Sequence, residues 1–222
     1  FHLLSDHNLL VRQRKGKAIT TNSRHWMKKY SNLIKDMEIT RPEQVWVSDI
    51  TYVRMVNQWG YLSLITDAFS RKIMGYSFRM DLTMQGCLDA LKMALNNKIY
   101  QDPLIHHSDR GSQYCSLQYV GLLLKNKTAI SMTENGDPYE NAIAERVNGI
   151  IKTAFNLHTS ALGFEKTYKH ISRSITNYNN LRPHASCDYL TPNQAHLKTT
   201  KLKKRWKIYQ QKNNPKMTLQ SF

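Results

Sequence analysis

The stretch that decides the fold reads Val45-Trp46-Val47-Ser48-Asp49-Ile50-Thr51-Tyr52-Val53. Apolar residues recur at every second position along much of it, and this period predicts a β-strand with one face toward a core. A carboxylate in the middle of such a strand is costly to bury unless hydrogen bonds or charges compensate it. Asp49 is therefore either a hydrogen-bonded structural residue or part of a site that needs a carboxylate.

The residues that follow predict two more strands, at 61–66 and 72–78, joined by short connections. Three consecutive strands connected in this way form an antiparallel meander. Asp67 begins the turn at 67–71, and we expect it to cap that turn rather than to belong to the site.

Helical and extended patterns then alternate along the chain. Apolar residues recur at helical spacing at 84–95 and again at 117–124, and two short apolar runs at 104–107 and 129–132 predict strands. Further helices are expected around 168–178 and from Thr191-Pro192 onward. The order β-β-β-α-β-α-β-α predicts an α/β fold with a mixed five-stranded sheet that combines the meander with parallel strands.

The helix that follows the fifth strand is predicted to begin near residue 137. Asp137 suits the N-cap, Pro138 the first helical position and Glu140 the third, as in a capping box. With this start, Glu145 lies well inside the helix and has no capping role.

One face of this helix is polar. Spacings of four, seven and eleven residues bring together Asn141, Glu145, Asn148 and Lys152. We expect this face to stay outside the core and to present one metal ligand, two amides and an ammonium group to DNA.

Three carboxylates occupy distinct local settings. Asp49 lies in the first strand, Asp109 directly follows the strand at 104–107, and 35 residues separate Asp109 from Glu145 on the helix. Taken singly, each has a structural explanation: a bonded aspartate, a turn residue before Gly111 and a solvated helical glutamate. Together they predict a site for two divalent cations, which can hold the attacking and leaving oxygens in phosphoryl transfer. Ligation by carboxylates alone favours Mg²⁺ or Mn²⁺ over zinc.

Other side chains near Asp109 are weaker candidates. Adjacent residues on a strand point to opposite faces, so His106 and His107 cannot both reach one ion. We expect one to be hydrogen-bonded in the core and the other to approach DNA. Ser112 and Tyr114 are the nearest nucleophiles, but no general base is evident beside either, and covalent catalysis is not expected.

The formal charge of the 222-residue chain is +16, and it is unevenly distributed. Residues 1–44 hold 9 Lys and Arg against 4 Asp and Glu, residues 45–145 hold 9 against 10, and residues 146–222 hold 14 against 2. Basic arms around a nearly neutral centre are typical of proteins that bind a polyanion, and nucleic acid is the expected partner. The candidate DNA contacts in the arms are Arg12, Arg14, Lys15, Lys17, Lys203, Lys204 and Arg205. Arg182 and His184 either contact phosphate or fix the loop around Pro183.

Composition excludes several other classes of protein. No run of apolar residues approaches the length of a membrane span, and the first residues do not have the pattern of a secretory signal. The three cysteines form no Cys-x-x-Cys pair, so neither a disulfide framework nor a structural zinc site is indicated. Reduced thiols in a cytoplasm are the expected state.

Five motifs in this order resemble the DDE transposases of the insertion sequence three family, which are relatives of retroviral integrases. The matching motifs are Trp46–Tyr52, Asp67–Arg71, His106–Tyr114, Asn141–Glu145 and Tyr178–His184. The resemblance runs from about Pro42 to Pro192. It implies an RNase H-like fold with Asp49, Asp109 and Glu145 as ligands of two metal ions, and it implies that Lys152 lies near the transposon end.

The resemblance also implies an activity. Members of this family cut one strand at an element end and join its 3′ hydroxyl to DNA, and related enzymes act as multimers that hold both ends. We therefore expect double-stranded DNA, both element end and target, as substrate, and a homo-oligomer of two or more copies on that DNA. The alternatives are a nuclease of the same fold that hydrolyses without joining, and a DNA-binding protein without activity.

Three regions are expected. Residues 1–40 form a basic linker that follows a helix-turn-helix region of the family, residues 41–160 form the RNase H-like catalytic core, and residues 161–222 form a helical extension with a basic tail. In the linker, Trp26 and Tyr30 either stack on DNA bases or pack on the core.

Overall fold

The protein is represented by a computed structural model that describes residues 6, 25–134, 141–157 and 162–203. Five strands form one mixed sheet in the order β3-β2-β1-β4-β5. They are β1 (Val45–Arg54), β2 (Trp59–Asp67), β3 (Ile73–Arg79), β4 (Ile105–Ser108) and β5 (Ala129–Met132). β1, β2 and β3 form the predicted antiparallel meander, while β4 runs parallel to β1 and β5 runs parallel to β4. The predicted α/β architecture is confirmed.

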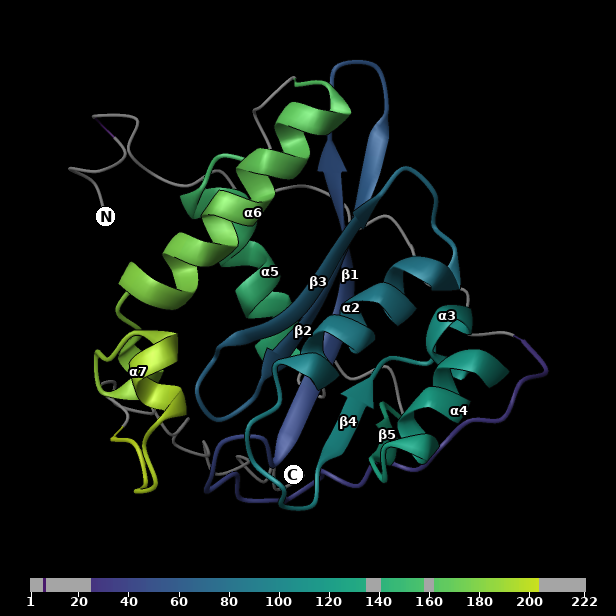
Figure 1. The fold of residues 1–222 in the computed structure, drawn as a ribbon, viewed down its shortest axis with the longest axis vertical. Helices are drawn as coiled ribbons and strands as arrows, with labels where there is room; N and C mark the ends of the chain where they lie inside the picture. Colours follow the sequence, from purple (N-terminus) through teal and green to yellow (C-terminus); the bar gives the residue numbers. More distant parts are fainter. Residues whose placement is uncertain (1–5, 7–24, 135–140, 158–161, 204–222) are drawn as a thin grey trace, which may run out of the picture.

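Helices cover both faces of the sheet (Figure 1). One face carries α2 (Met84–Asn96), α3 (Ser112–Cys115) and α4 (Leu117–Lys125). The other carries α5 (Ala142–Ala154) and α6 (Phe164–Leu181), followed by a short 3₁₀ helix η1 (Ala185–Cys187) and α7 (Pro192–His196). Among the described residues, none of these helices combines the length and the hydropathy needed to cross a bilayer.

The alternation in β1 separates two apolar clusters. Trp46 packs with Leu91 and Leu123 on the side of α2 and α4, whereas Val53 packs with Ile151 and residues of α6 on the opposite side. Because successive side chains of a strand point to opposite faces, one short sequence supplies both layers. The cluster around Val53 joins α5 and α6 to the same sheet, so residues on both sides of position 160 share one core.

The start of α5 differs from the prediction. Asn141 is the N-cap, with a non-helical backbone (φ −120°, ψ 21°), and the helix begins at Ala142. The predicted capping box of Asp137, Pro138 and Glu140 lies outside the described residues. Glu145 falls in the first turn of α5, so the expectation that it lies well inside the helix is wrong. This position is favourable for a carboxylate, because the positive end of the helix dipole is at the N-terminus.

A buried polar cluster connects α7 to the sheet. Asp67 caps its turn as predicted, because its Oδ1 accepts hydrogen bonds from the amide and the hydroxyl of Ser70 at 2.8 and 2.7 Å. His196 of α7 lies against Ser70 (Nδ1 to Oγ, 3.0 Å) and against Glu43 (Nε2 to Oε1, 3.2 Å). All four side chains are buried. These contacts fix α7 to the segment just before β1 and to the turn after β2 through buried polar side chains.

Candidate active site

Asp49 occupies the middle of β1, where it is only partly exposed. Its Oδ1 accepts a hydrogen bond from the amide of Ile50 at 2.9 Å, and its Oδ2 accepts one from Nδ2 of Asn148 at 2.6 Å. Burial is the largest influence on this carboxyl and the negative charge of Asp109 is the next, and together they raise the pKa of Asp49 to about 7. The ionised form of Asp49 is therefore unfavourable until a positive charge compensates it.

Asp109 directly follows β4, which runs parallel to β1 and ends beside it. Its Oδ1 accepts a hydrogen bond from the amide of Gly111 at 2.9 Å, so the turn after β4 orients the carboxylate. Asp49 and Asp109 line the same small pocket, of about 40 Å³. The other residues of its lining are Ile50, Tyr52, Leu82, Gln113 and Tyr114. The structure thus brings together the two aspartates that the sequence predicted.

Glu145 is placed differently. It is exposed in the first turn of α5 and does not line the pocket of the two aspartates. Its charge nevertheless contributes to the raised pKa of Asp49, after the larger effects of burial and Asp109. Within the part of the chain that the structure describes, no three His, Cys, Asp or Glu side chains are gathered closely enough to hold a metal ion. Glu145 is therefore near the aspartates without forming a closed ligand set with them.

The two amides of α5 face inward. Asn141 and Asn148 are buried, at 8% and 4% exposure, so the expectation that the polar face of this helix stays outside the core is wrong for both. Nδ2 of Asn141 donates to the carbonyl of Ser48 at 3.2 Å, next to the bond between Asn148 and Asp49. The reason is that this face of α5 packs on the polar stretch of β1, where the amides satisfy groups that apolar side chains would leave unpaired.

This donor set fits a divalent cation of the hard class. The groups near the pocket are carboxylate oxygens, which Mg²⁺ and Mn²⁺ prefer. The buried amide oxygens of Asn141 and Asn148 have no hydrogen-bond partner among the described residues. Two mutually repelling carboxylates and unpaired amide oxygens make the neighbourhood electronegative, and a cation would relieve that state.

Both histidines of β4 are buried, which corrects the expectation that one of them approaches DNA. Nε2 of His106 lies 2.6 Å from Oγ of Ser48 and 2.8 Å from the hydroxyl of Tyr119. Burial is the main cause that lowers the pKa of His106 to about 3, so this ring is neutral. Nδ1 of His107 lies 2.8 Å from Oγ of Ser131 on β5. β4 is an inner strand covered on both faces, which is why both of its histidines lack access to solvent.

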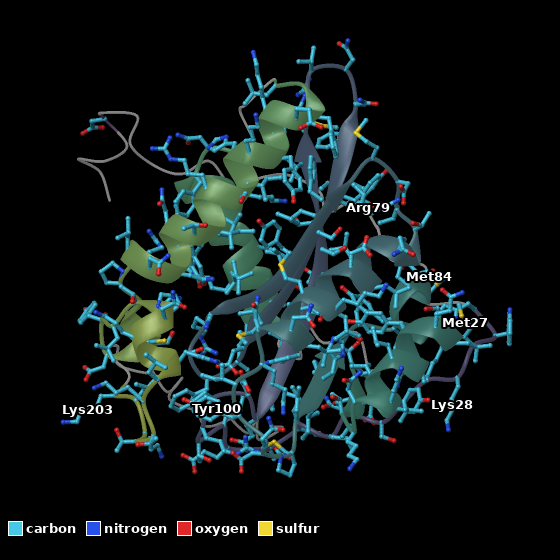
Figure 2. All side chains as sticks on the ribbon, in the orientation of Figure 1. Met27, Lys28, Arg79, Met84, Tyr100 and Lys203 are labelled. Carbon is cyan, nitrogen blue, oxygen red and sulfur yellow. The ribbon has the colours of Figure 1, made fainter. Side chains whose placement is uncertain are left out.

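The remaining predicted DNA contacts are dispersed. Lys152 lies in the last turn of α5, and Lys203 is exposed at the edge of the molecule below α7 (Figure 2). His184 accepts a hydrogen bond at Nδ1 from the amide of Ser186, which supports the prediction that it fixes its loop. Arg182 is partly exposed at the C-cap of α6. The other predicted contacts lie outside the described residues, namely Arg12, Arg14, Lys15, Lys17, Lys204 and Arg205.

The two aromatic residues of the predicted linker differ in their burial. Trp26 is 91% exposed, whereas Tyr30 packs against the cluster that contains Trp46. Packing on the core therefore holds for Tyr30 and not for Trp26.

The sequence analysis assigned no role in the site to three residues of the pocket lining. Tyr52, Leu82 and Gln113 line the pocket, and Nε2 of Gln113 donates to the carbonyl of Leu82 at 3.2 Å. Leu82 lies in no motif, and Gln113 lies in the motif His106–Tyr114 without an assigned role, because their part in the lining depends on a tertiary contact between α3 and the segment before α2. For the hydrogen bond between Asn148 and Asp49, the sequence predicted only that Asn148 lies on the polar face of α5.

The ionised carboxyl group of Asp49 is expected to lower the free energy of unfolding. The folded carboxyl keeps its proton up to a pH of about 7, whereas the unfolded one loses it near 3.8, so the free energy of unfolding falls as pH rises between these values. In metal-free buffer above pH 7, Asp49→Asn should raise the free energy of unfolding by about 1–2 kcal/mol. Urea unfolding at a pH above 7 and at one near 4 measures this, with the exposed Asp102→Asn as control. Equal stability of wild type and Asp49→Asn at the higher pH would contradict it.

The chain is similar to known proteins over most of its length. It matches the integrase core domain family over residues 39–138 and again over residues 126–192. The "Insertion element IS600 uncharacterized 31 kDa protein" of Shigella sonnei is 34% identical over 191 residues, which are 83% of this chain and 68% of that protein. "Transposase InsF for insertion sequence IS3A" of Escherichia coli strain K12 is 33% identical over 172 residues, which are 77% of this chain and 60% of that protein. The chain thus spans about two thirds of the length of these relatives.

Solved structures show the same fold at lower identity. The catalytic core domain of HTLV-2 integrase, in complex with magnesium, superposes with a TM-score of 0.57 at 21% identity and covers 70% of this chain and 97% of that one. A chain of the simian T-cell lymphotropic virus intasome, in complex with a PP2A regulatory subunit, superposes with a TM-score of 0.62 at 19% identity and covers 86% of this chain and 67% of that one. The predicted RNase H-like fold is confirmed.

The two family matches run together from residue 39 to residue 192, which includes the whole sheet and both aspartates of the pocket. Both of these relatives are proteins of bacterial insertion sequences. The chain therefore belongs to the integrase core domain family, together with the transposases of IS3-type insertion sequences.

Proposed function

We propose that this chain is the catalytic part of a DNA transposase, which cleaves one strand at an element end and joins the resulting 3′ hydroxyl to DNA. The observation that carries the proposal is the meeting of Asp49 and Asp109 in one pocket on an integrase fold. The negative charge of Asp109 raises the pKa of Asp49 after the larger effect of burial, as expected where two carboxylates converge. The transposase names of the relatives support the same reaction.

Asp49, Asp109 and Glu145 would hold Mg²⁺ or Mn²⁺, and we expect two ions. When bound, the ions supply positive charge at the attacking and leaving oxygens of the phosphodiester. The magnesium in the HTLV-2 integrase complex supports this cofactor class. The exposure of Glu145 suits a ligand that completes the site when DNA and metal are present, because an exposed side chain can change rotamer at little cost.

The protein's own groups orient the carboxylates. Nδ2 of Asn148 and the amide of Ile50 each donate to one oxygen of Asp49, and the amide of Gly111 donates to Asp109. These bonds hold both aspartates at the pocket before substrate arrives. We assign Asn141 and Asn148 to positioning β1 and Asp49, in place of the direct DNA contact expected from their spacing.

The charge distribution supports double-stranded DNA as the substrate. Residues 146–222 carry 14 Lys and Arg against 2 Asp and Glu, and Lys152, Arg182 and Lys203 are the described candidates for phosphate contacts in this part. A homo-oligomer that holds two element ends and a cytoplasmic, nucleoid-associated location are further parts of the proposal. The presence of an intasome among the structural neighbours supports an assembled form.

The decisive experiment uses end-labelled DNA that carries the terminus of the insertion sequence encoding this chain. Incubation with Mg²⁺ is expected to yield both a cleaved strand and longer strand-transfer products, and neither in the presence of a chelator. Cleavage without joined products would identify a nuclease. DNA binding without either product would identify an inactive DNA-binding protein, and both of these results would overturn the proposal.

A further inference from the structure

The β1–β2 hairpin carries a row of three aromatic side chains on one face, of which Trp59 is exposed and Tyr52 and Tyr61 are partly exposed. Tyr52 on β1 is paired directly with Tyr61 on β2, and Trp59 lies two residues from Tyr61, so the three rings share a face. Ring centroids are 5.1 Å apart for Tyr52 and Tyr61 and 6.4 Å apart for Tyr52 and Trp59, with edge-to-face orientations. Trp59 is 53% exposed. The hairpin reaches the top of the view in Figure 1, above α2.

The opposite face of the hairpin is packed firmly. Val53 and Leu62 are buried there, and a Cβ added at Gly60 would lie 2.3 Å from the ring of Phe78. Phe78 in turn stacks on Phe164 at the start of α6, with centroids 5.3 Å apart. The exposed aromatic face is therefore held by a rigid support, which lowers the entropic cost of binding a ligand on it.

This aromatic face is continuous with the candidate active site. Tyr52 lines the pocket that contains Asp49 and Asp109, and Tyr61 and Trp59 extend from Tyr52 along the hairpin. Arg54 pairs with Trp59 across the hairpin and is exposed. Residues 50–66 contain no Asp or Glu, so nothing on these two strands beyond Asp49 repels phosphate before Asp67.

Accessible aromatic rings beside Arg54, on a stretch of two strands (residues 50–66) that itself holds no Asp or Glu, suit one class of ligand. Aromatic side chains stack on nucleobases that have left the duplex, while an arginine holds the backbone. We propose that Tyr52, Trp59 and Tyr61 form a stacking platform for unpaired bases of the DNA strand whose phosphate enters the pocket of Asp49 and Asp109. That the bound strand is the reacting strand depends on the proposed function. It explains why this face carries three aromatic rings where polar side chains would be better solvated.

The test compares two labelled probes by fluorescence anisotropy in metal-free buffer. One is a thymine oligonucleotide of about 15 nucleotides, and the other is an abasic oligonucleotide of the same length and charge. Trp59→Ala should weaken binding of the thymine probe about tenfold and leave binding of the abasic probe unchanged. Trp59→Phe should restore most of the loss. Tyr189→Ala removes an aromatic side chain of similar exposure (60%) between η1 and α7 and should bind both probes like the wild type.

Three results would overturn the platform. These are unchanged thymine binding in Trp59→Ala, an equal loss for both probes, and a change of sedimentation behaviour without a change in thymine binding, which would make this face a contact between protein copies. Because metal is absent, the result does not depend on catalysis. If the wild type does not cleave DNA but Trp59→Ala binds the thymine probe more weakly, the proposed function is refuted and the platform stands. If the wild type cleaves DNA and Trp59→Ala binds the thymine probe normally, the platform is refuted and the proposed function stands.

Discussion

Asp109→Asn is expected to lower the rate of Mg²⁺-dependent strand cleavage by about a thousandfold, the upper size for removing one electrostatic contact to a transition state. Asparagine keeps the oxygen that accepts the hydrogen bond from Gly111 at 2.9 Å, so the turn after β4 should survive. What the variant loses is one of two negative charges in the pocket shared with Asp49. The measurement is the single-turnover rate on labelled element-end DNA, with thermal unfolding as the check of folding.

Matched controls make this test specific to position. Asp102→Asn removes an exposed carboxylate from the segment before β4 and should cleave at the wild-type rate. Glu145→Gln and Glu165→Gln form a second pair, because both glutamates are exposed in the first turn of a helix. Only Glu145→Gln should lose activity, while its DNA binding is retained. Full activity in Asp109→Asn, or equal activity in the glutamate pair, would refute the assigned ligands.

His196→Ala is expected to destabilise the fold by about 3 kcal/mol or more, because it leaves two buried carboxylates without their cationic partner. His196 is fully buried between Glu43 at 3.2 Å and Asp67 at 3.7 Å. Burial disfavours the charged ring, but the nearby carboxyl groups of Asp67 and Glu43 outweigh it and raise the pKa of His196 above its ordinary value of 6.5. Urea unfolding of the wild type and the variant measures the loss.

The pH dependence of this loss tests the charge on the ring. A histidine whose folded pKa is raised contributes its full stability below the unfolded value of 6.5, and this contribution disappears as pH rises through the folded pKa. The difference between wild type and His196→Ala should therefore be largest well below 6.5 and should shrink at alkaline pH. His170→Ala on α6, a partly exposed histidine, is the control. A difference that stays constant with pH would show that His196 acts as a neutral packing group.

Much of the architecture could be predicted from local sequence. The alternation in 45–53 predicted β1, and strand and helix patterns downstream predicted the meander, β4 and β5 near their observed bounds. These predictions succeeded because a strand that faces two apolar layers, or a helix that covers a sheet, repeats its apolar residues with a fixed period. Asp67 could be assigned to its turn for a similarly local reason, since an aspartate caps the amides of the next few residues.

The errors occurred where partners are distant in sequence. One of the two histidines of β4 was expected to approach DNA, yet both are buried, because β4 lies between β1 and β5 in a sheet that carries helices on both faces. Asn148 was expected at a solvent-facing surface, yet it donates a hydrogen bond to Asp49, which lies 99 positions earlier in the chain. Periodicity reports which residues share a face of one element, but it carries no information about which other element covers that face.

The amino-acid sequence by itself determined the order of strands and helices, the identity of the acidic residues and the basic character of the C-terminal part, because these depend on local period and composition. Only the tertiary structure decided that Asp49 and Asp109 share a pocket, that Glu145 stands outside it, and that the aromatic face of the hairpin adjoins it. The physical reason is that the parallel pairing of β1 with β4 sets the position of Asp109 relative to Asp49, and the packing of α5 on β1 sets the position of Glu145. Both are contacts between segments far apart in the chain.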